Sequence, residues 1–367
     1  MTLAQASSRT GFDSFLGNER AVSMLREMLS RRAVPGSLLF AGPAGVGKQT
    51  LACMFAKALN CERLQDDFCG QCARCLKAEQ MLSLTREDLA RRRDTKDASR
   101  RVEGLIYFDL QLIEPITRFI LTEQIRQLRY TAYTRPFELP RRVFIIDQAQ
   151  AIHWQAVDLL LKVIEEPPES VTFILVCPNP NELRATLRSR CQKIQFRPVR
   201  DDEIRRLLQE ERGIPPTQIE LATRYAAGSI GSAKSLDMAD FQAKRKLWAD
   251  YFEAIASQDW RRASGSEWKV FFDTAKALAG AGSQLQESLR IGYALLGDML
   301  RIIESENEAR IINVDLIPRL RRWADSLGLQ GLDHLRLGLD DAYRLQTRNV
   351  NQQLGWEELA FEIPAGR

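Results

Sequence analysis

A glycine-rich loop near the start of the chain has the residue types that bind phosphate. Residues 38–50 read Leu-Leu-Phe-Ala-Gly-Pro-Ala-Gly-Val-Gly-Lys-Gln-Thr. Glycines let backbone N–H groups curl around phosphate oxygens, and the lysine that follows supplies a positive charge. The expected nucleotide-site residues of this loop are Gly42, Gly45, Gly47, Lys48, Gln49 and Thr50.

The same loop lacks a group that nucleotide hydrolysis uses. The residue after the lysine normally carries a hydroxyl that holds Mg²⁺, but Gln49 has no hydroxyl. Thr50 has one, yet a single helical step rotates the side chain by about 100°, so we expect it to point elsewhere. The sequence therefore predicts a degenerate site without Mg²⁺. It leaves open whether ATP or ADP binds there.

An acidic residue, Asp147, directly follows the apolar run of residues 143–146. In P-loop motors an aspartate at this place reaches Mg²⁺ through water, and a following glutamate polarises the attacking water. Here the following residue is Gln148, which accepts no proton at neutral pH. We expect Asp147 to belong to the nucleotide site. The alternative is that Asp147 only caps the helix that follows it.

Four cysteines have the spacing of a metal site. Two overlapping Cys-x-x-Cys steps curl the backbone, and four thiolates at about 2.3 Å suit a closed tetrahedral Zn²⁺ ion. Because no coordination position is left for water, we expect a structural zinc; unmetallated buried thiols or a redox pair are the alternatives. The expected ligands are Cys61, Cys69, Cys72 and Cys75. The cysteines expected in or near the core are Cys53, Cys177 and Cys191.

The hydropathy pattern predicts the elements that hold these residues. Helical spacing of apolar residues alternates with short β-rich runs, which is typical of a mostly parallel sheet covered by helices on both faces. The expected strands are residues 38–40, 105–112, 143–146, 171–176 and 193–196. One helix is expected over residues 116–130.

Beyond residue 198 the pattern is helical. We expect an α/β domain over residues 1–198 with the cysteine knuckle at 61–75, a small helical domain over 199–240, and a helical bundle over 241–367. Residues 86–103 are rich in charge, which is typical of a solvated loop or helix. The sequence gives this charged segment no function.

The composition narrows the class of protein. The chain has 367 residues, of which 45% are apolar and 27% charged, as in ordinary soluble proteins. A net charge of +4 permits contact with nucleic acid without arguing for it. No apolar run is long enough to span a bilayer, and residues 1–14 lack the apolar core of a secretory signal. An odd total of seven cysteines argues against a disulfide framework, so we expect a cytoplasmic protein without a membrane partner.

The order of the motifs resembles the clamp-loader branch of the AAA+ ATPases. The phosphate loop, the cysteine knuckle and Val-Phe-Ile-Ile-Asp are followed by Leu-Leu-Leu-Lys-Val-Ile-Glu-Glu-Pro-Pro at 159–168 and Thr-Leu-Arg-Ser-Arg-Cys at 186–191. The resemblance covers the whole chain and is dense through residue 198. It implies an AAA+ P-loop domain, a helical lid domain and a C-terminal collar domain that joins subunits.

The resemblance also assigns a role to Arg190. In clamp loaders this arginine reaches across a subunit interface to the γ-phosphate of a neighbour's ATP, where a guanidinium stabilises developing charge. The alternative is an ordinary surface or salt-bridged arginine. Active members carry a lid arginine where this chain has Gly231. With Gln49 and Gln148 also altered, the resemblance implies a subunit that serves another subunit's hydrolysis.

The sequence leads to three alternative hypotheses for the function of the chain. The first is a non-hydrolysing clamp-loader subunit at one end of an arc of AAA+ subunits, in an assembly that opens a ring-shaped sliding clamp and places it on primed DNA. The second is the ATPase motor subunit itself, with Thr50 or water replacing the missing hydroxyl. The third is a zinc-dependent nucleic-acid-binding module that uses residues 91–101. The mild net charge and the lack of aromatic residues within that basic run argue against the third.

Overall fold

A computed structural model shows two compact units, and each is described by itself. The residues described are 11–97, 99–212, 214–257, 266–280, 285–304, 311–345 and 352–362. The first unit comprises residues 1–204 and 227–232, and the second comprises residues 205–226 and 233–367. The expected helical domain of residues 199–240 contributes to both units, so the three-domain division stays a prediction.

The first unit is built on a five-stranded parallel sheet, which confirms the expected α/β class. Its strands are β1 (Ser37–Ala41), β2 (Leu110–Ile113), β3 (Arg142–Ile146), β4 (Val171–Cys177) and β5 (Gln192–Gln195). Their order across the sheet is β2-β3-β4-β1-β5. Because all neighbouring strands are parallel, the ends of β1, β2 and β3 meet at one edge, and the phosphate loop, residue 114 and Asp147 follow there.

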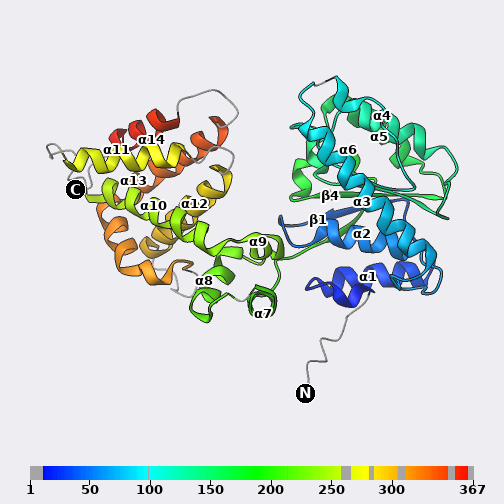
Figure 1. Ribbon diagram of the computed structural model, residues 1–367, viewed down its shortest axis with the longest axis horizontal. Coiled ribbons are helices and arrows are strands. Elements are labelled where there is room, and N and C mark those ends of the chain that lie inside the picture. Colours follow the sequence, from blue (N-terminus) through cyan, green and yellow to red (C-terminus); the bar gives the residue numbers. More distant parts are fainter. Residues whose placement is uncertain are drawn as a thin grey trace, which may run out of the picture. The chain divides into compact units, whose positions relative to one another are not determined.

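Among the described residues, six α-helices belong wholly to this unit. They are α1 (Glu19–Ser30), α2 (Lys48–Ala58), α3 (Ala73–Asp94), α4 (Thr122–Ala132), α5 (Trp154–Glu165) and α6 (Ala185–Arg188). Figure 1 shows α1 and α2 on one side of the strands and α4 and α5 on the other.

The alternation of side chains along each strand explains the two helical layers. In β1, Leu38 and Phe40 pack into the apolar cluster that contains α1, α2 and α3. The intervening Leu39 and Ala41 pack into the cluster of α4, α5 and α6. Successive side chains of a strand point to opposite faces, so a strand that is apolar at every position is covered on both.

Most predicted strand boundaries agree with the structure to within one residue, but the starts of the second strand and of the helix after it differ by more. The second strand begins only at Leu110, because the backbone N–H of Phe108 donates to the side chain of Gln111 at 3.1 Å instead of joining the sheet. The following helix begins at Thr122 rather than at residue 116. The reason is that Ile120 pairs with Ile152 in an isolated parallel bridge, which holds residues 116–120 out of the helix.

In the part of the second unit that the structure describes, the regular elements are all helices. Its helices are α8 (Pro216–Ala226), α10 (Met238–Ser257), α11 (Ser266–Ala279), α12 (Leu285–Ile303), α13 (Ile317–Leu345) and α14 (Gln352–Glu362), while α7 (Asp201–Arg212) and α9 (Ile230–Ser235) cross between the units. The buried rings of Trp248 and Trp356 lie 5.4 Å apart, which packs α14 against α10. Among the described helices, none has the length and apolar character that crossing a membrane requires.

Candidate phosphate-loop site and cysteine cluster

The phosphate loop connects β1 to α2, as the sequence predicts, and its glycines are packed closely. Gly45 has a φ of +73°, and a Cβ there would lie 2.0 Å from the hydroxyl of Ser229. A Cβ at Gly42 would lie 2.5 Å from the carbonyl oxygen of Phe196. The loop is therefore covered by other parts of its own unit at positions where only glycine fits.

Lys48, the expected phosphate ligand, is turned onto its own loop. The residue is 7% exposed, and its ammonium donates to the carbonyl oxygens of Gly42 and Pro43, both at 2.6 Å. Burial lowers the pKa of Lys48, while the charges of Asp147 and Cys177 raise it in part. Backbone carbonyls of the loop thus occupy the ammonium group that would otherwise bind a phosphate.

Gln49 also has a partner inside the protein. Its amide nitrogen donates to Glu114 Oε1 at 2.5 Å, and the other oxygen of Glu114 accepts from Arg93 at 2.5 Å. Arg93 additionally donates to the carbonyl of Pro115 at 3.1 Å. The sequence reasoning missed Glu114 and Arg93, although Glu114 directly follows an apolar strand just as Asp147 does. Thr50 is exposed one residue further along α2.

The two strand-end carboxylates lie at the same edge of the sheet. Ile113 of β2 pairs with Ile146 of β3, so Glu114 and Asp147 follow neighbouring positions. Burial raises the pKa of Asp147, and the charge of Glu114 adds to that shift, while Lys48 and Arg93 oppose it. The loop, Asp147 and Glu114 therefore form one electrostatic group of two carboxylates, one lysine and one arginine.

The residues after Asp147 leave the site. Gln148 adopts a left-handed conformation with φ 52°, and its backbone N–H donates to Asp147 Oδ1 at 2.9 Å. Its side chain is exposed. The carboxylate of Asp147 therefore accepts a local backbone bond, as a capping residue would. The side chain that follows it has neither the chemistry nor the position of a general base.

The segment that carries Gly231 closes over the phosphate loop. The backbone N–H of Gly231 donates to the carbonyl of Gly45 at 2.8 Å. Ser229 of the same segment has its hydroxyl against Gly45. Residues 227–232 belong to the first unit, so these contacts lie within one compact body. A glycine at 231 allows a close approach, because a Cβ there would already be 3.2 Å from the Gly45 Cα.

Arg190 lies between α6 and β5, where two sequence motifs meet. Its guanidinium forms an ion pair with Glu165 at 2.5 Å and donates to the carbonyl of Thr186 at 3.0 Å. The side chains of Arg190 and Glu165 are 37% and 45% exposed. Glu165 is the first glutamate of the Glu-Glu-Pro-Pro motif, so this ion pair joins that motif to the Ser-Arg-Cys motif of Arg190. The contact that Arg190 makes across a subunit interface stays a prediction.

The four cysteines expected to hold metal come together. Their sulfurs all lie within 4.8 Å of one another. Backbone N–H groups of Cys72 and Cys75 donate to sulfurs at 3.3 and 3.4 Å, and Cys72 caps the start of α3. Although burial acts against it, backbone N–H groups of Glu62 and Cys75 lower the pKa of Cys72 to about 6. Four converging sulfur donors with no other ligand type fit a closed tetrahedral zinc site.

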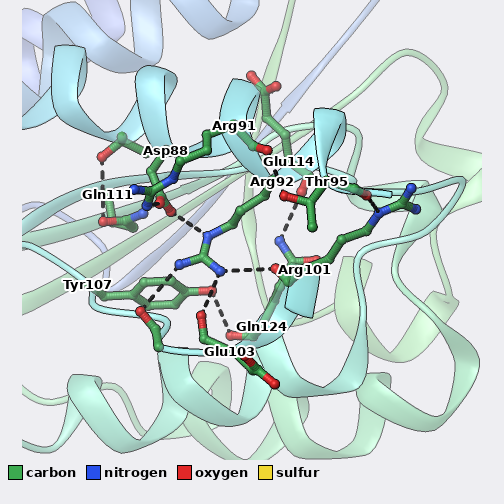
Figure 2. A network of polar contacts seen from close by, with 12 residues as sticks. Asp88, Arg91, Arg92, Thr95, Arg101, Glu103, Tyr107, Gln111, Glu114 and Gln124 are labelled. Atoms are coloured by element: carbon green, nitrogen blue, oxygen red, sulfur yellow. Dashed lines mark hydrogen bonds and ion pairs between the residues drawn. The ribbon is translucent and has the colours of Figure 1, made fainter. Parts of the chain in front are cut away.

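The charged segment 86–103 is largely exposed, as the sequence predicts, and among its described residues the buried ones are Leu89 and Arg92. It forms the end of α3 and the loop after it, and the side chain of Arg92 is only 8% exposed. Arg92 donates to the carbonyls of Arg101, Glu103 and Gly104 at 3.0, 2.9 and 3.2 Å. Figure 2 shows its guanidinium among these acceptors, next to Asp88 and above Tyr107. A buried arginine therefore ties the loop to the helix.

Fold and site together define the class. A parallel sheet with β1 between β4 and β5, a phosphate loop after β1 and a following helical region define an α/β P-loop fold. Residues 17–200 match the protein family described as DNA polymerase III, delta subunit, and the chain belongs to that family.

Two curated relatives are also DNA polymerase III subunits, but they are tau subunits and not delta subunits. The chain is 27% identical over 231 residues to the DNA polymerase III subunit tau of Bacillus subtilis, which covers 61% of this chain and 37% of the relative. It is 29% identical over 231 residues to the tau subunit of Escherichia coli, covering 61% and 32%. The chain thus matches about a third of the length of these relatives. A gamma subunit-related protein of Thermotoga maritima aligns with a TM-score of 0.43 and 15% identity over 93% of this chain and 97% of that one.

Proposed function

We propose that this chain is the delta-prime subunit of the clamp loader of bacterial DNA polymerase III, and that it does not hydrolyse ATP itself. The observation that carries the proposal is the internal engagement of the phosphate loop. Lys48 bonds to its own loop, and Gln49 bonds to Glu114 in place of a metal-holding hydroxyl. Gly231 seats the adjoining segment on Gly45. A nucleotide would have to displace several of these contacts before hydrolysis could begin.

The chemical contribution of the chain is then made in trans by Arg190. Its guanidinium is partly exposed and is held by a partly exposed carboxylate, so it can exchange Glu165 for a phosphate oxygen. A planar guanidinium presents paired donors to the transferring phosphoryl group. A neighbouring subunit's ATP would thereby be hydrolysed with help from this chain.

Membership of the family supports the partners that we propose. The chain would sit in a hetero-pentamer with gamma/tau-like ATPase subunits and a delta-like subunit, and the assembly would open the sliding clamp and load it on primed DNA. The helical residues 241–367 would form the collar contacts, residues 199–240 the lid, and residues 1–198 the AAA+ domain. In this function the chain is a cytoplasmic part of a nucleotidyltransferase holoenzyme.

The cysteine cluster would hold a structural zinc ion. Its ligands would be Cys61, Cys69, Cys72 and Cys75. Bound zinc would supply a fixed cross-link between the loop after α2 and the first turn of α3. The four sulfurs fill a tetrahedral set, so the site offers no place for a reacting water.

The deciding experiment replaces Arg190 in the assembled complex. Arg190→Ala should leave assembly unchanged and reduce clamp-stimulated ATP turnover at the interface that this chain supplies. Arg188→Ala is the matched control, because Arg188 lies on the same turn but bonds to Pro180 and Asn181 of its own surface. Equal ATPase and clamp-loading rates for the Arg190→Ala complex and the wild type would overturn the proposal.

A second candidate is the ATPase motor subunit, which the similarity to tau subunits favours. The retained Lys48 and Asp147 are the residues that a motor would use. Steady-state ATPase of the purified chain with Mg²⁺ tests this function. Turnover that Lys48→Ala abolishes would establish the motor and exclude the non-hydrolysing role.

A further inference from the structure

The three consecutive arginines at the end of α3 lie in three different environments. Arg91 is 75% exposed and pairs with Asp88 of its own helix. Arg92 is buried and binds the carbonyls of the following loop. Arg93 is 42% exposed and reaches across to Glu114 at the end of β2. Of the three, only Arg93 connects α3 to the phosphate-loop edge of the sheet.

The end of α3 is a fixed base for Arg93. Arg92 holds three carbonyl oxygens of the loop at residues 101–104, and Asp88 fixes its guanidinium from the preceding turn. Figure 2 shows these contacts around Arg92. Because buried charge-assisted bonds are strong and directional, the last turn of α3 has little freedom to move Arg93 away.

Glu114 is held on its other sides as well. Its carbonyl oxygen accepts from the side chain of Gln124 at 3.0 Å, and the oxygen of that same amide caps the N–H of Leu121 at 2.9 Å. One carboxylate oxygen of Glu114 binds Arg93 and the other binds Gln49. The glutamate side chain is only 15% exposed. A single carboxylate therefore joins α3, the end of β2 and the first turn of α2.

Charge in this corner is balanced by the protein's own groups. The negative charges are those of Glu114 and Asp147, and the positive charges are those of Arg93 and Lys48. In a metal-using P-loop, a divalent cation and the nucleotide phosphates complete this balance. Here the formal charges of these four side chains cancel without either of them.

We propose that Arg93 and Glu114 form an autoinhibitory latch that holds Gln49 and keeps the phosphate loop closed to nucleotide. This proposal rests on the proposed non-hydrolysing function. It adds that two residues outside the glycine-rich loop, Arg93 and Glu114, help to prevent nucleotide binding. A nucleotide needs Lys48 released from Gly42 and Pro43, and α2 begins at Lys48. Fixing the next residue to Glu114 raises the free energy of that opening.

A simpler role for Arg93 has the opposite consequence. If Arg93 were a phosphate ligand, removing its charge would weaken the binding of a nucleotide. If it is a latch, removing it releases Gln49 and strengthens nucleotide binding, because the competent state becomes more populated. The sign of the change separates the two roles.

The test uses the full chain with three substitutions. Arg93→Met and Glu114→Ala each break the latch, and Glu114→Ala keeps the arginine charge. Arg91→Met is the matched control, since Arg91 lies on the same turn and its side chain pairs with Asp88 of its own helix. Amide hydrogen exchange of residues 45–49 should accelerate on the order of tenfold in both latch variants, the scale of one lost charge-assisted hydrogen bond. Unchanged exchange in both would overturn the latch.

The second readout is the affinity for fluorescently labelled ADP in EDTA. Arg93→Met and Glu114→Ala should bind it more tightly than the wild type and Arg91→Met do. Equal or weaker binding by Arg93→Met overturns the latch. The proposed function fails separately, through ATP turnover by the unmodified chain, so the two failures can be told apart.

Discussion

Two arginine–glutamate pairs in the first unit have the same separation but different surroundings. Arg93–Glu114 and Arg190–Glu165 are both 2.5 Å apart. Glu114 is 15% exposed and shares its second oxygen with Gln49, whereas Glu165 is 45% exposed. The first pair joins three elements and the second secures one side chain at the surface. An arginine–glutamate pair can therefore hold one site closed where it is buried, and leave an arginine available to a partner where it is exposed.

The largest expected effect is on ATP hydrolysis, and it follows from replacing Arg190 of the exposed pair. Arg190→Lys keeps the charge but removes the planar fork, so it should lose most of the roughly 10³–10⁵-fold that an arginine finger contributes. Single-turnover ATP hydrolysis by the assembled complex measures this loss, with Arg188→Lys as control. Wild-type turnover for Arg190→Lys would remove the proposed difference between the two pairs.

Zinc removal should destabilise the first unit, to which both ion pairs belong. A bound ion stabilises the fold by about 4 kcal/mol when its free concentration is a thousand times its Kd. Chelation, or Cys75→Ala, should lower the free energy of unfolding of the first unit by an amount on that scale, as measured in urea with metal content by mass spectrometry. Equal stability with and without chelator, at a verified zinc stoichiometry, would contradict this prediction.

The two glutamates should differ in their contribution to stability. Glu114→Gln leaves Arg93 facing a neutral amide in a mostly buried corner and should cost about 1 kcal/mol, while Glu165→Gln at the exposed pair should cost less than about 0.5 kcal/mol. Urea unfolding of both variants measures the contrast. Equal costs would mean that burial does not distinguish the pairs.

The smallest effect concerns pH and Asp147. Its pKa in the folded protein is raised by burial above the ordinary value of 3.8, so the folded state holds its proton more tightly than the unfolded state. Stability from this group is complete below pH 3.8 and falls as pH rises through the raised pKa. Asp147→Asn should therefore be more stable than the wild type at neutral pH and equal to it in acid. A constant difference across that range in urea titrations would show that ionisation of Asp147 is not the cause.

Much of the fold could be predicted because its signals are local. The apolar run that ends at Ala41 and the glycines after it identify β1 and the loop, since every position of a doubly covered strand is apolar. The four-cysteine spacing predicted a cluster that the structure forms. The errors arose where side chains from elsewhere decide a boundary. Gln111 stops β2 from beginning earlier, and Ile152 pairs with Ile120 before α4 can start.

The site was predictable only in part for the same reason. Lys48, Gln49 and Asp147 could be placed at one edge because strand ends converge there. Glu114 gives the same kind of signal, a carboxylate after an apolar strand, yet Arg93 lies 21 residues before it in a run of like charges. Sequence periodicity could not separate Arg93 from Arg91, because their different exposure depends on what packs beside α3.

By itself, the sequence determined the class of fold, the loss of the metal-holding hydroxyl at Gln49, and the grouping of four thiols. These features depend on residue type and on short spacings along the chain, which can be recognised without the tertiary structure. Tertiary structure decided what Gln49 bonds to, which arginine of α3 is buried, and how Arg190 meets Glu165. Those choices depend on side chains brought together from distant segments, where burial fixes the strength of each charge interaction.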